Sequence, residues 1–164
     1  MILFGKIVII TTEKINEMNK VLITNRKATH DFHIMETHEV GVALKGTEVK
    51  SMRLGNASLQ DSYAIINNGE VWLLNMHISP FDQAGINNHD PRRDRKLLLH
   101  RKEIRRLLGK TQEPGVTLIP IRVYLKDNII KIELAVVRGK KMFDKREAIA
   151  KRDVERDIKR KYAK

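Results

Sequence analysis

The segment from His30 to Glu39 holds the side chains of this sequence that are best suited to chemistry: His30, Asp31, His33, Glu36, His38 and Glu39. Imidazoles and carboxylates bind metal ions or exchange protons when they converge. On an extended strand, however, His30, Glu36 and His38 point to one side and the other three point to the opposite side. No His-x-x-x-His or His-Glu-x-x-His spacing occurs. We therefore expect no metal site here, and interpret these residues as a solvated strand face or as contacts to bases and phosphates.

The rest of the sequence also lacks the patterns of a catalytic centre. It contains no Cys, which removes disulfides, thiolate metal sites and cysteine nucleophiles and fits a reducing, cytoplasmic setting. It has no nucleophile elbow and no phosphate-binding glycine loop. We expect neither an enzyme nor a cofactor, and an RNA-cleaving enzyme argued from the His and acid cluster is a distant alternative.

Positive charge is concentrated in two blocks. Arg92 to Lys110 contains nine Lys or Arg and two acids, and Arg138 to Lys164 contains twelve and five. Each block carries a net charge of +7, whereas the whole chain carries +12, so the remainder is slightly acidic. This segregation favours a polyanionic partner, although a basic helix can also be a merely solvated face.

The first block predicts an amphipathic helix that begins after Asp90-Pro91 and ends at Gly109. Its apolar stripe is Leu97, Leu98, Ile104, Leu107 and Leu108, and its cations lie mostly opposite. The second block, from Asp144 onward, has an apolar stripe only one residue wide. A helix with so little to bury is marginal in water, so we expect a tail that is disordered alone and helical against a polyanion.

The segment between the N-terminus and the second block predicts a mainly β fold. Phe32–Leu44 reads as a strand broken by Gly41, and Thr47–Leu54 as a short helix ended by Gly55. Two hairpins follow, residues 57–66 with 70–78 around Asn67-Asn68-Gly69, and residues 116–125 with 128–137. Residues 79–91 read as a loop. About five strands favour a closed antiparallel barrel with flanking helices.

The N-terminal run MILFGKIVII is apolar, but ten residues are too few to span a bilayer. Its internal Lys6 does not fit a secretory signal. We interpret residues 1–24 as an extension, an added strand or a disordered segment. Translation from Met18 is a further alternative.

Several short blocks follow one another along the chain: Asn25-Arg26-Lys27-Ala28, His30-Asp31-Phe32, Glu36-Thr37-His38-Glu39-Val40-Gly41, Gly46-Thr47-Glu48-Val49-Lys50-Ser51, Asp90-Pro91, Arg95-Lys96-Leu97-Leu98-Leu99-His100, Gly139-Lys140-Lys141 and Asp144-Lys145-Arg146. Together these blocks resemble the small protein B family, which binds transfer-messenger RNA. The resemblance runs in order from about Asn25 to the C-terminus.

This resemblance implies a non-enzymatic partner of transfer-messenger RNA in the rescue of stalled ribosomes. It implies an oligonucleotide-binding-type barrel over residues 25–138, which grips the transfer-RNA-like part of the RNA near its D-loop, and a tail over residues 139–164, which folds in the vacant messenger channel. We expect a monomer. A generic basic barrel protein of the ribosome or of translation initiation is the alternative.

The resemblance also implies functional residues. Those matched to RNA binding are His30, Phe32, Glu39, Leu98 and His100, and to them we add the cations Lys50, Arg53, Arg95, Lys96, Arg101 and Arg105. Those expected to meet the ribosome are Gly139, Lys140, Lys141, Asp144, Lys145, Arg146, Lys151, Arg152, Arg156 and Tyr162. Phe32 stands where many members have Tyr, and His38 stands where an aromatic residue is usual.

Overall fold

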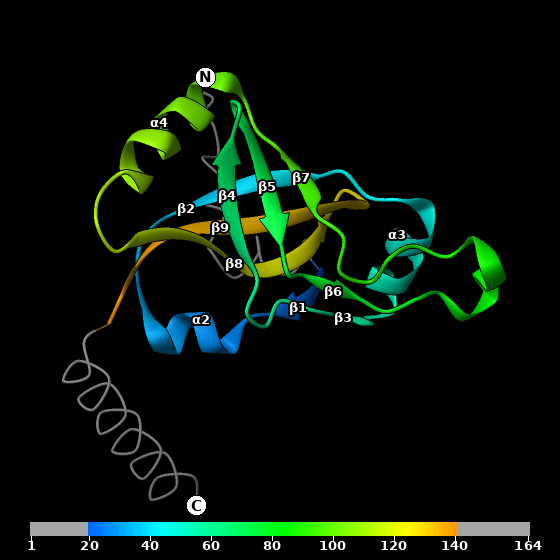
Figure 1. Cartoon of the computed structure of the whole chain (residues 1–164). Coiled ribbons are helices and arrows are strands. Elements are labelled where there is room, and N and C mark those ends of the chain that lie inside the picture. Colours follow the sequence, from blue (N-terminus) through cyan, green and yellow to red (C-terminus); the bar gives the residue numbers. More distant parts are fainter. Residues whose placement is uncertain (1–19, 141–164) are drawn as a thin grey trace, which may run out of the picture.

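The computed structural model describes residues 20–140, and these form an antiparallel barrel with helices on its outside (Figure 1). The strands are β1 (Lys20–Thr24), β2 (Phe32–Val42), β3 (Ala57–Ser58), β4 (Tyr63–Asn67), β5 (Glu70–Leu74), β6 (His77–Ile78), β7 (Arg95–Leu98), β8 (Val116–Lys126) and β9 (Ile129–Gly139). The helices are α2 (Arg26–Asp31), α3 (Gly46–Arg53), the 3-10 helix η1 (Asp82–Asn87) and α4 (Arg101–Thr111).

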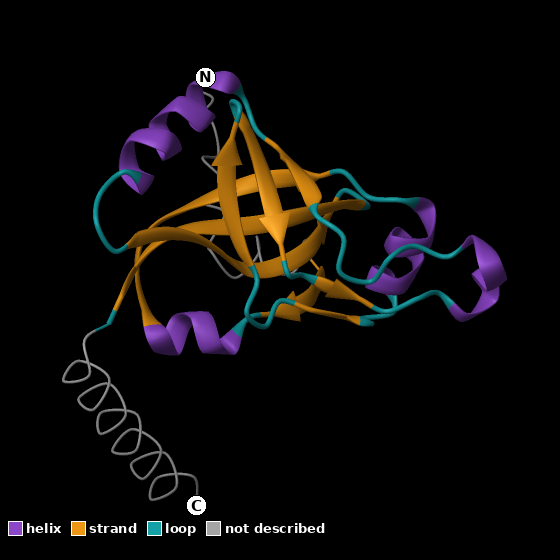
Figure 2. Cartoon of the chain, viewed as in Figure 1, coloured by secondary structure: helices purple, strands orange, loops and turns teal. Residues whose placement is uncertain are grey.

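The main sheet closes on itself. Its strand order is β1-β8-β4-β5-β7-β2-β9, and β9 also pairs with β8, so six strands form a ring and β1 lies along β8 outside it. Figure 2 shows the strands wrapped around one centre, with the helices outside. Closure pairs the strand edges of the ring, and the expected mainly β barrel with flanking helices is confirmed.

Both predicted hairpins are present. The β4–β5 turn places Asn68 and Gly69 at φ values of 50° and 73°, and the β8–β9 turn places Asp127 and Asn128 at 48° and 65°. Gly and Asn tolerate this left-handed region better than other residues. The predicted strand over residues 32–44 corresponds to β2, and the short helix before Gly55 corresponds to α3.

The interior is filled by alternate residues of the ring strands. Val40, Leu73, Leu97 and Leu134 are each at most 1% exposed and belong to one apolar cluster. A second, smaller cluster lies between α2 and the outer face of β8 and β9, and consists of Ala28, Ile119, Ile121, Ala135 and Val137. The barrel therefore offers a rigid support for whatever its outer surface binds.

The single helix predicted for the first basic block is wrong. Arg95–Leu98 forms strand β7, which pairs with both β5 and β2, and helix α4 begins only at Arg101. The helix also continues past Gly109 to Thr111. Arg95 and Leu97 are buried, whereas Lys96 and Leu98 lie on the outside of the sheet. This alternation of buried and outward residues has the period of a strand. Pairing on both sides outweighed the local helical pattern.

A strand precedes the predicted start of the barrel. Residues 20–24 belong to the segment interpreted as an extension, an added strand or a disordered segment, and they form β1, which pairs with β8 outside the ring. Helix α2 was not predicted. The buried Asn25 caps it, because its side-chain oxygen accepts from the backbone N–H of Ala28 at 3.1 Å. With the short strands β3 and β6, the strand count exceeds the five that were expected.

Among the helices within residues 20–140, none combines the length and the apolar composition that crossing a membrane requires.

Candidate nucleic-acid interface

A groove of about 910 Å³ lies on the outer surface of the barrel, beside α4. It is bordered by the β4–β5 turn, by β7 and the start of α4, and by outward residues of β2 and β9. Figure 1 shows α4 next to the tip of the β4–β5 hairpin. Six of the residues predicted to bind RNA line this groove: Glu39, Lys96, Leu98, His100, Arg101 and Arg105. The fold thus brings together residues from β2, β7 and α4.

Strand β7 delivers the apolar part of the groove. Leu98 lies opposite Gly41 of β2 and is 52% exposed. A Cβ at position 41 would lie 3.2 Å from the Cβ of Leu98, closer than side-chain carbons normally approach. The glycine therefore lets the two strands present Leu98 at the surface.

Helix α4 contributes two guanidinium groups to the groove. It begins after His100, whose backbone N–H donates to Glu103 Oε2 at 2.8 Å. Leu107 is buried against the barrel, while Arg101 and Arg105 are one turn apart, exposed, and both line the groove. Their guanidinium groups are suited to phosphate contacts.

The far end of α4 is tied to β2 through Glu36. The Glu36 carboxylate lies 2.5 Å from Lys110 Nζ and 3.1 Å from Arg106 Nη2, and His38 Nε2 lies 3.1 Å from its other oxygen. The hydrogen bond from Lys110, with His38 and the charge of Arg106, lowers the pKa of Glu36 to about 2. Glu36 and His38 share a face, as predicted, and within residues 20–140 no three His, Asp or Glu side chains form a metal-ligand set.

Glu39 sits at the edge of the groove with two partners that the sequence did not suggest. Tyr124 donates its hydroxyl to Glu39 Oε2 at 2.7 Å, and Lys126 Nζ lies 2.9 and 3.0 Å from the two carboxylate oxygens. The Tyr124 hydrogen bond, together with Lys126, lowers the pKa of Glu39, while burial and the carboxylate raise the pKa of Tyr124. Glu39 is therefore an oriented carboxylate with accepting capacity left on Oε1.

Arg95 is not available to RNA, contrary to the prediction. Its side chain is 0% exposed and donates to Glu48 Oε1 at 2.9 Å and to the carbonyl of Met76 at 2.6 Å. Arg93 also contacts Glu48, at 2.6 Å. Arg95 is a structural residue that fixes the start of β7.

Arg95 and Glu48 both remain charged although they are buried. Burial would raise the pKa of Glu48, but the hydrogen bonds from Arg93 and from the Lys45 backbone, with the nearby positive charges, hold that pKa below its usual range. Burial lowers the pKa of Arg95, and Glu48 opposes that shift. A buried Arg with a carboxylate partner remains protonated.

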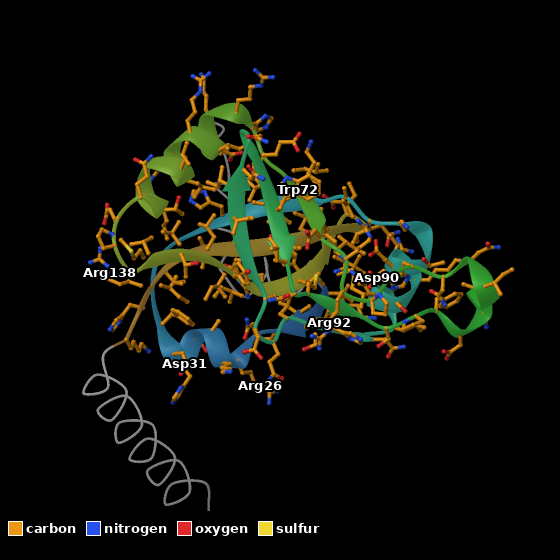
Figure 3. All side chains as sticks on the ribbon, viewed as in Figure 1. Arg26, Asp31, Trp72, Asp90, Arg92 and Arg138 are labelled. Carbon is orange, nitrogen blue, oxygen red and sulfur yellow. The ribbon has the colours of Figure 1, made fainter. Side chains whose placement is uncertain are left out.

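His30 and Phe32 lie away from the groove. Phe32 is seven residues before Glu39 on β2, which corresponds to about 23 Å of strand. It packs against the smaller apolar cluster, and His30 Nδ1 lies 2.8 Å from Asp31 Oδ1. In Figure 3, Arg26 and Asp31 mark α2 at the end of the barrel away from α4. These two predicted RNA contacts therefore belong to a different surface.

Lys50 and Arg53 lie on α3 and do not line the groove. The Lys50 ammonium lies 5.2 Å from the centroid of the Phe81 ring, and Arg53 donates to the carbonyl of Asn128 at 3.2 Å. Both are exposed, but the fold separates them from Arg101 and Arg105.

Of the residues predicted to meet the ribosome, the structure describes the first two. Gly139 ends β9 opposite Phe32, and Lys140 Nζ donates to the carbonyl of Thr29 at 3.1 Å, which ties this segment to the end of α2. The others lie outside the described residues: Lys141, Asp144, Lys145, Arg146, Lys151, Arg152, Arg156 and Tyr162.

The barrel and the groove define the class: an oligonucleotide-binding-type barrel with a mixed basic, apolar and carboxylate site on its outer face. The family model described as "SmpB protein" matches residues 22–164. The chain belongs to the SmpB protein family.

Individual relatives agree with this assignment. The "SsrA-binding protein" of Carboxydothermus hydrogenoformans is 59% identical over 86% of this chain and 95% of its own length. That of Caldicellulosiruptor saccharolyticus is 63% identical over 87% and 90%. A solved structure described as "tmRNA-SmpB: a journey to the center of the bacterial ribosome" has a TM-score of 0.63 and 46% identity, and covers 77% of this chain and 93% of that chain.

Proposed function

We propose that this protein binds the transfer-RNA-like domain of transfer-messenger RNA and delivers that RNA to stalled ribosomes, where incomplete proteins are tagged and released. The observation that carries the proposal is the groove, which gathers side chains from β2, β7 and α4. The names of its relatives, SsrA-binding protein, and the solved assembly of tmRNA with SmpB support the same partner.

The groove offers a distinct contact for each part of an RNA strand. Arg101 and Arg105 meet phosphates, whereas His100 and the exposed Leu98 contact bases or sugars. The Glu39 carboxylate accepts from a guanine edge or from a 2′-hydroxyl, and Lys126 beside it offsets its repulsion of phosphate. The cations supply affinity, and Glu39 supplies selectivity.

The barrel and the tail have different tasks in this proposal. The barrel grips the RNA near its D-loop and takes the place of the missing anticodon arm, while residues 139–164 enter the vacant messenger channel and fold there as a helix. The protein acts as a monomer in the cytoplasm, and it positions RNA without catalysing a reaction.

Sequencing of the RNA that copurifies with the protein after crosslinking in cells tests this proposal. Transfer-messenger RNA should be the dominant species, and ribosomal RNA alone would favour the generic barrel protein instead. Deleting residues 144–164 should leave the affinity for the transfer-RNA-like domain nearly intact while abolishing tagging on stalled ribosomes. Loss of RNA affinity in that deletion would reject the division of tasks.

A further inference from the structure

Strands β4 and β5 carry an apolar and aromatic outer surface next to the groove. Tyr63 and Ile65 of β4 are 38% and 40% exposed. Trp72 and Leu74 of β5 are partly exposed, while the alternate residues Ala64, Val71 and Leu73 are buried. We call the outward set Tyr63, Ile65, Trp72 and Leu74 the aromatic face. The interior is already filled by the buried residues, so the aromatic face is not needed to form the core.

The strand register joins the aromatic face to the groove. Ile65 lies opposite Trp72, and Trp72 lies opposite Lys96 of β7. Lys96 forms an ion pair with Glu70, and both residues line the groove. Trp72, on β5 (Figure 3), is therefore one strand away from a groove wall. A strand of RNA that leaves the groove over Lys96 would meet Trp72 next.

We propose that the aromatic face is a stacking surface for unpaired bases of the RNA that occupies the groove. Aromatic side chains on an outer sheet surface, with cations at the border to hold the backbone, are the arrangement by which barrels of this type bind single strands. Lys96 supplies the bordering cation, and Trp72 and Tyr63 supply the ring surfaces. A protein partner would also fit an apolar surface, but the shared border with the groove favours RNA.

The chain offers a direct probe, because Trp72 is its only tryptophan. The full-length protein is titrated with a transcript of the transfer-RNA-like domain, and Trp72 fluorescence and filter binding are recorded on the same samples. The inference, which rests on the proposed function, predicts quenching of Trp72 along the binding curve and protection from acrylamide. Full binding with unchanged emission and unchanged acrylamide access would overturn it and leave the proposed function intact. Absence of binding would overturn both this inference and the proposed function. Protection of Trp72 by ribosomes, but not by the transcript, would overturn the inference and indicate that the aromatic face contacts the ribosome.

Substitutions provide the second readout. Trp72→Leu should weaken binding of the transcript by at least about fivefold, because base stacking on an aromatic ring contributes roughly 1 to 3 kcal/mol. Trp72→Phe keeps a ring and should retain most of the affinity. Leu54→Ser removes an apolar side chain that is 66% exposed at the end of α3, away from the groove, and should leave the affinity for the transcript unchanged. Equal affinities of the Trp72→Leu and Trp72→Phe proteins would contradict stacking.

Discussion

Replacing Arg95 with Met separates a structural role from an RNA contact at the centre of the first basic block. Arg95 is fully buried and donates to Glu48, to the carbonyl of Met76 and, at 3.0 and 3.1 Å, to the carbonyls of Arg93 and Pro91. Met has a similar volume but can form none of these bonds. The substitution therefore leaves Glu48 with one cationic partner in place of two, and it leaves three carbonyl groups without this donor.

The expected loss of stability follows from that inventory. Breaking one side of a buried ion pair costs about 3 to 5 kcal/mol, and the lost hydrogen bonds to the three carbonyls add to that cost. This is a large share of the roughly 5 to 15 kcal/mol by which a domain is stable. Arg101→Met makes the same chemical change at an exposed position of α4, and it should alter stability by no more than about 0.5 kcal/mol.

Urea unfolding at neutral pH, followed by circular dichroism, measures both variants. RNA binding across a range of salt concentrations completes the comparison, because each lost phosphate contact lowers the slope of log affinity against log salt by about one. The folded Arg95→Met protein should keep the slope of the parent, whereas Arg101→Met should lose about one. A stable Arg95→Met protein with a reduced slope would refute the buried role of Arg95.

Two further substitutions address the carboxylates of β2. Glu36→Gln should lower the free energy of unfolding by about 2 kcal/mol at pH 7, after allowance for screening of its exposed partners. Because folding depresses the pKa of Glu36 to about 2, this contribution should disappear as pH falls from about 4.5 towards 2. A difference in urea titrations that does not depend on pH would contradict the Lys110 contact. Tyr124→Phe removes the hydroxyl that orients Glu39 and should weaken RNA binding about fivefold, equivalent to roughly 1 kcal/mol. Because no charge changes, the slope of log affinity against log salt should stay constant. An unaltered affinity would reject the orienting role of Tyr124.

The parts of the fold that were predictable from the sequence are those set by local chemistry. The Asn68-Gly69 and Asp127-Asn128 turns specify their hairpins because few other residue pairs accept positive φ at low cost. Strand β7 was not predictable in this way, since its leucines also fit a helical stripe and only its pairing with β5 and β2 decides the outcome. Similarly, the cap of α2 depends on Asn25, which is held by the carbonyl of Pro120, 95 residues away.

The site residues also differ in whether the sequence can predict them. Arg101, Arg105, Leu98 and Glu39 were identified because their residue types and the sequence blocks around them point to RNA binding. Nothing local marks Tyr124, because its role comes from a contact to Glu39 across 85 residues of sequence. The burial of Arg95 was hidden for the same reason. Its partner Glu48 comes from a distant helix.

The central claim is that the groove beside α4 is the RNA interface. It is tested most directly by two variants that each lose two positive charges, one on α4 and the other on α3. The pair Arg101→Gln with Arg105→Gln removes two exposed cations from the groove, and Lys50→Gln with Arg53→Gln removes two exposed cations from α3. Both variants have the same net charge. Binding of the transfer-RNA-like domain across salt concentrations should lose about two from its slope in the groove variant and nothing in the α3 variant. Equal losses in both, or a loss confined to the α3 variant, would contradict the claim.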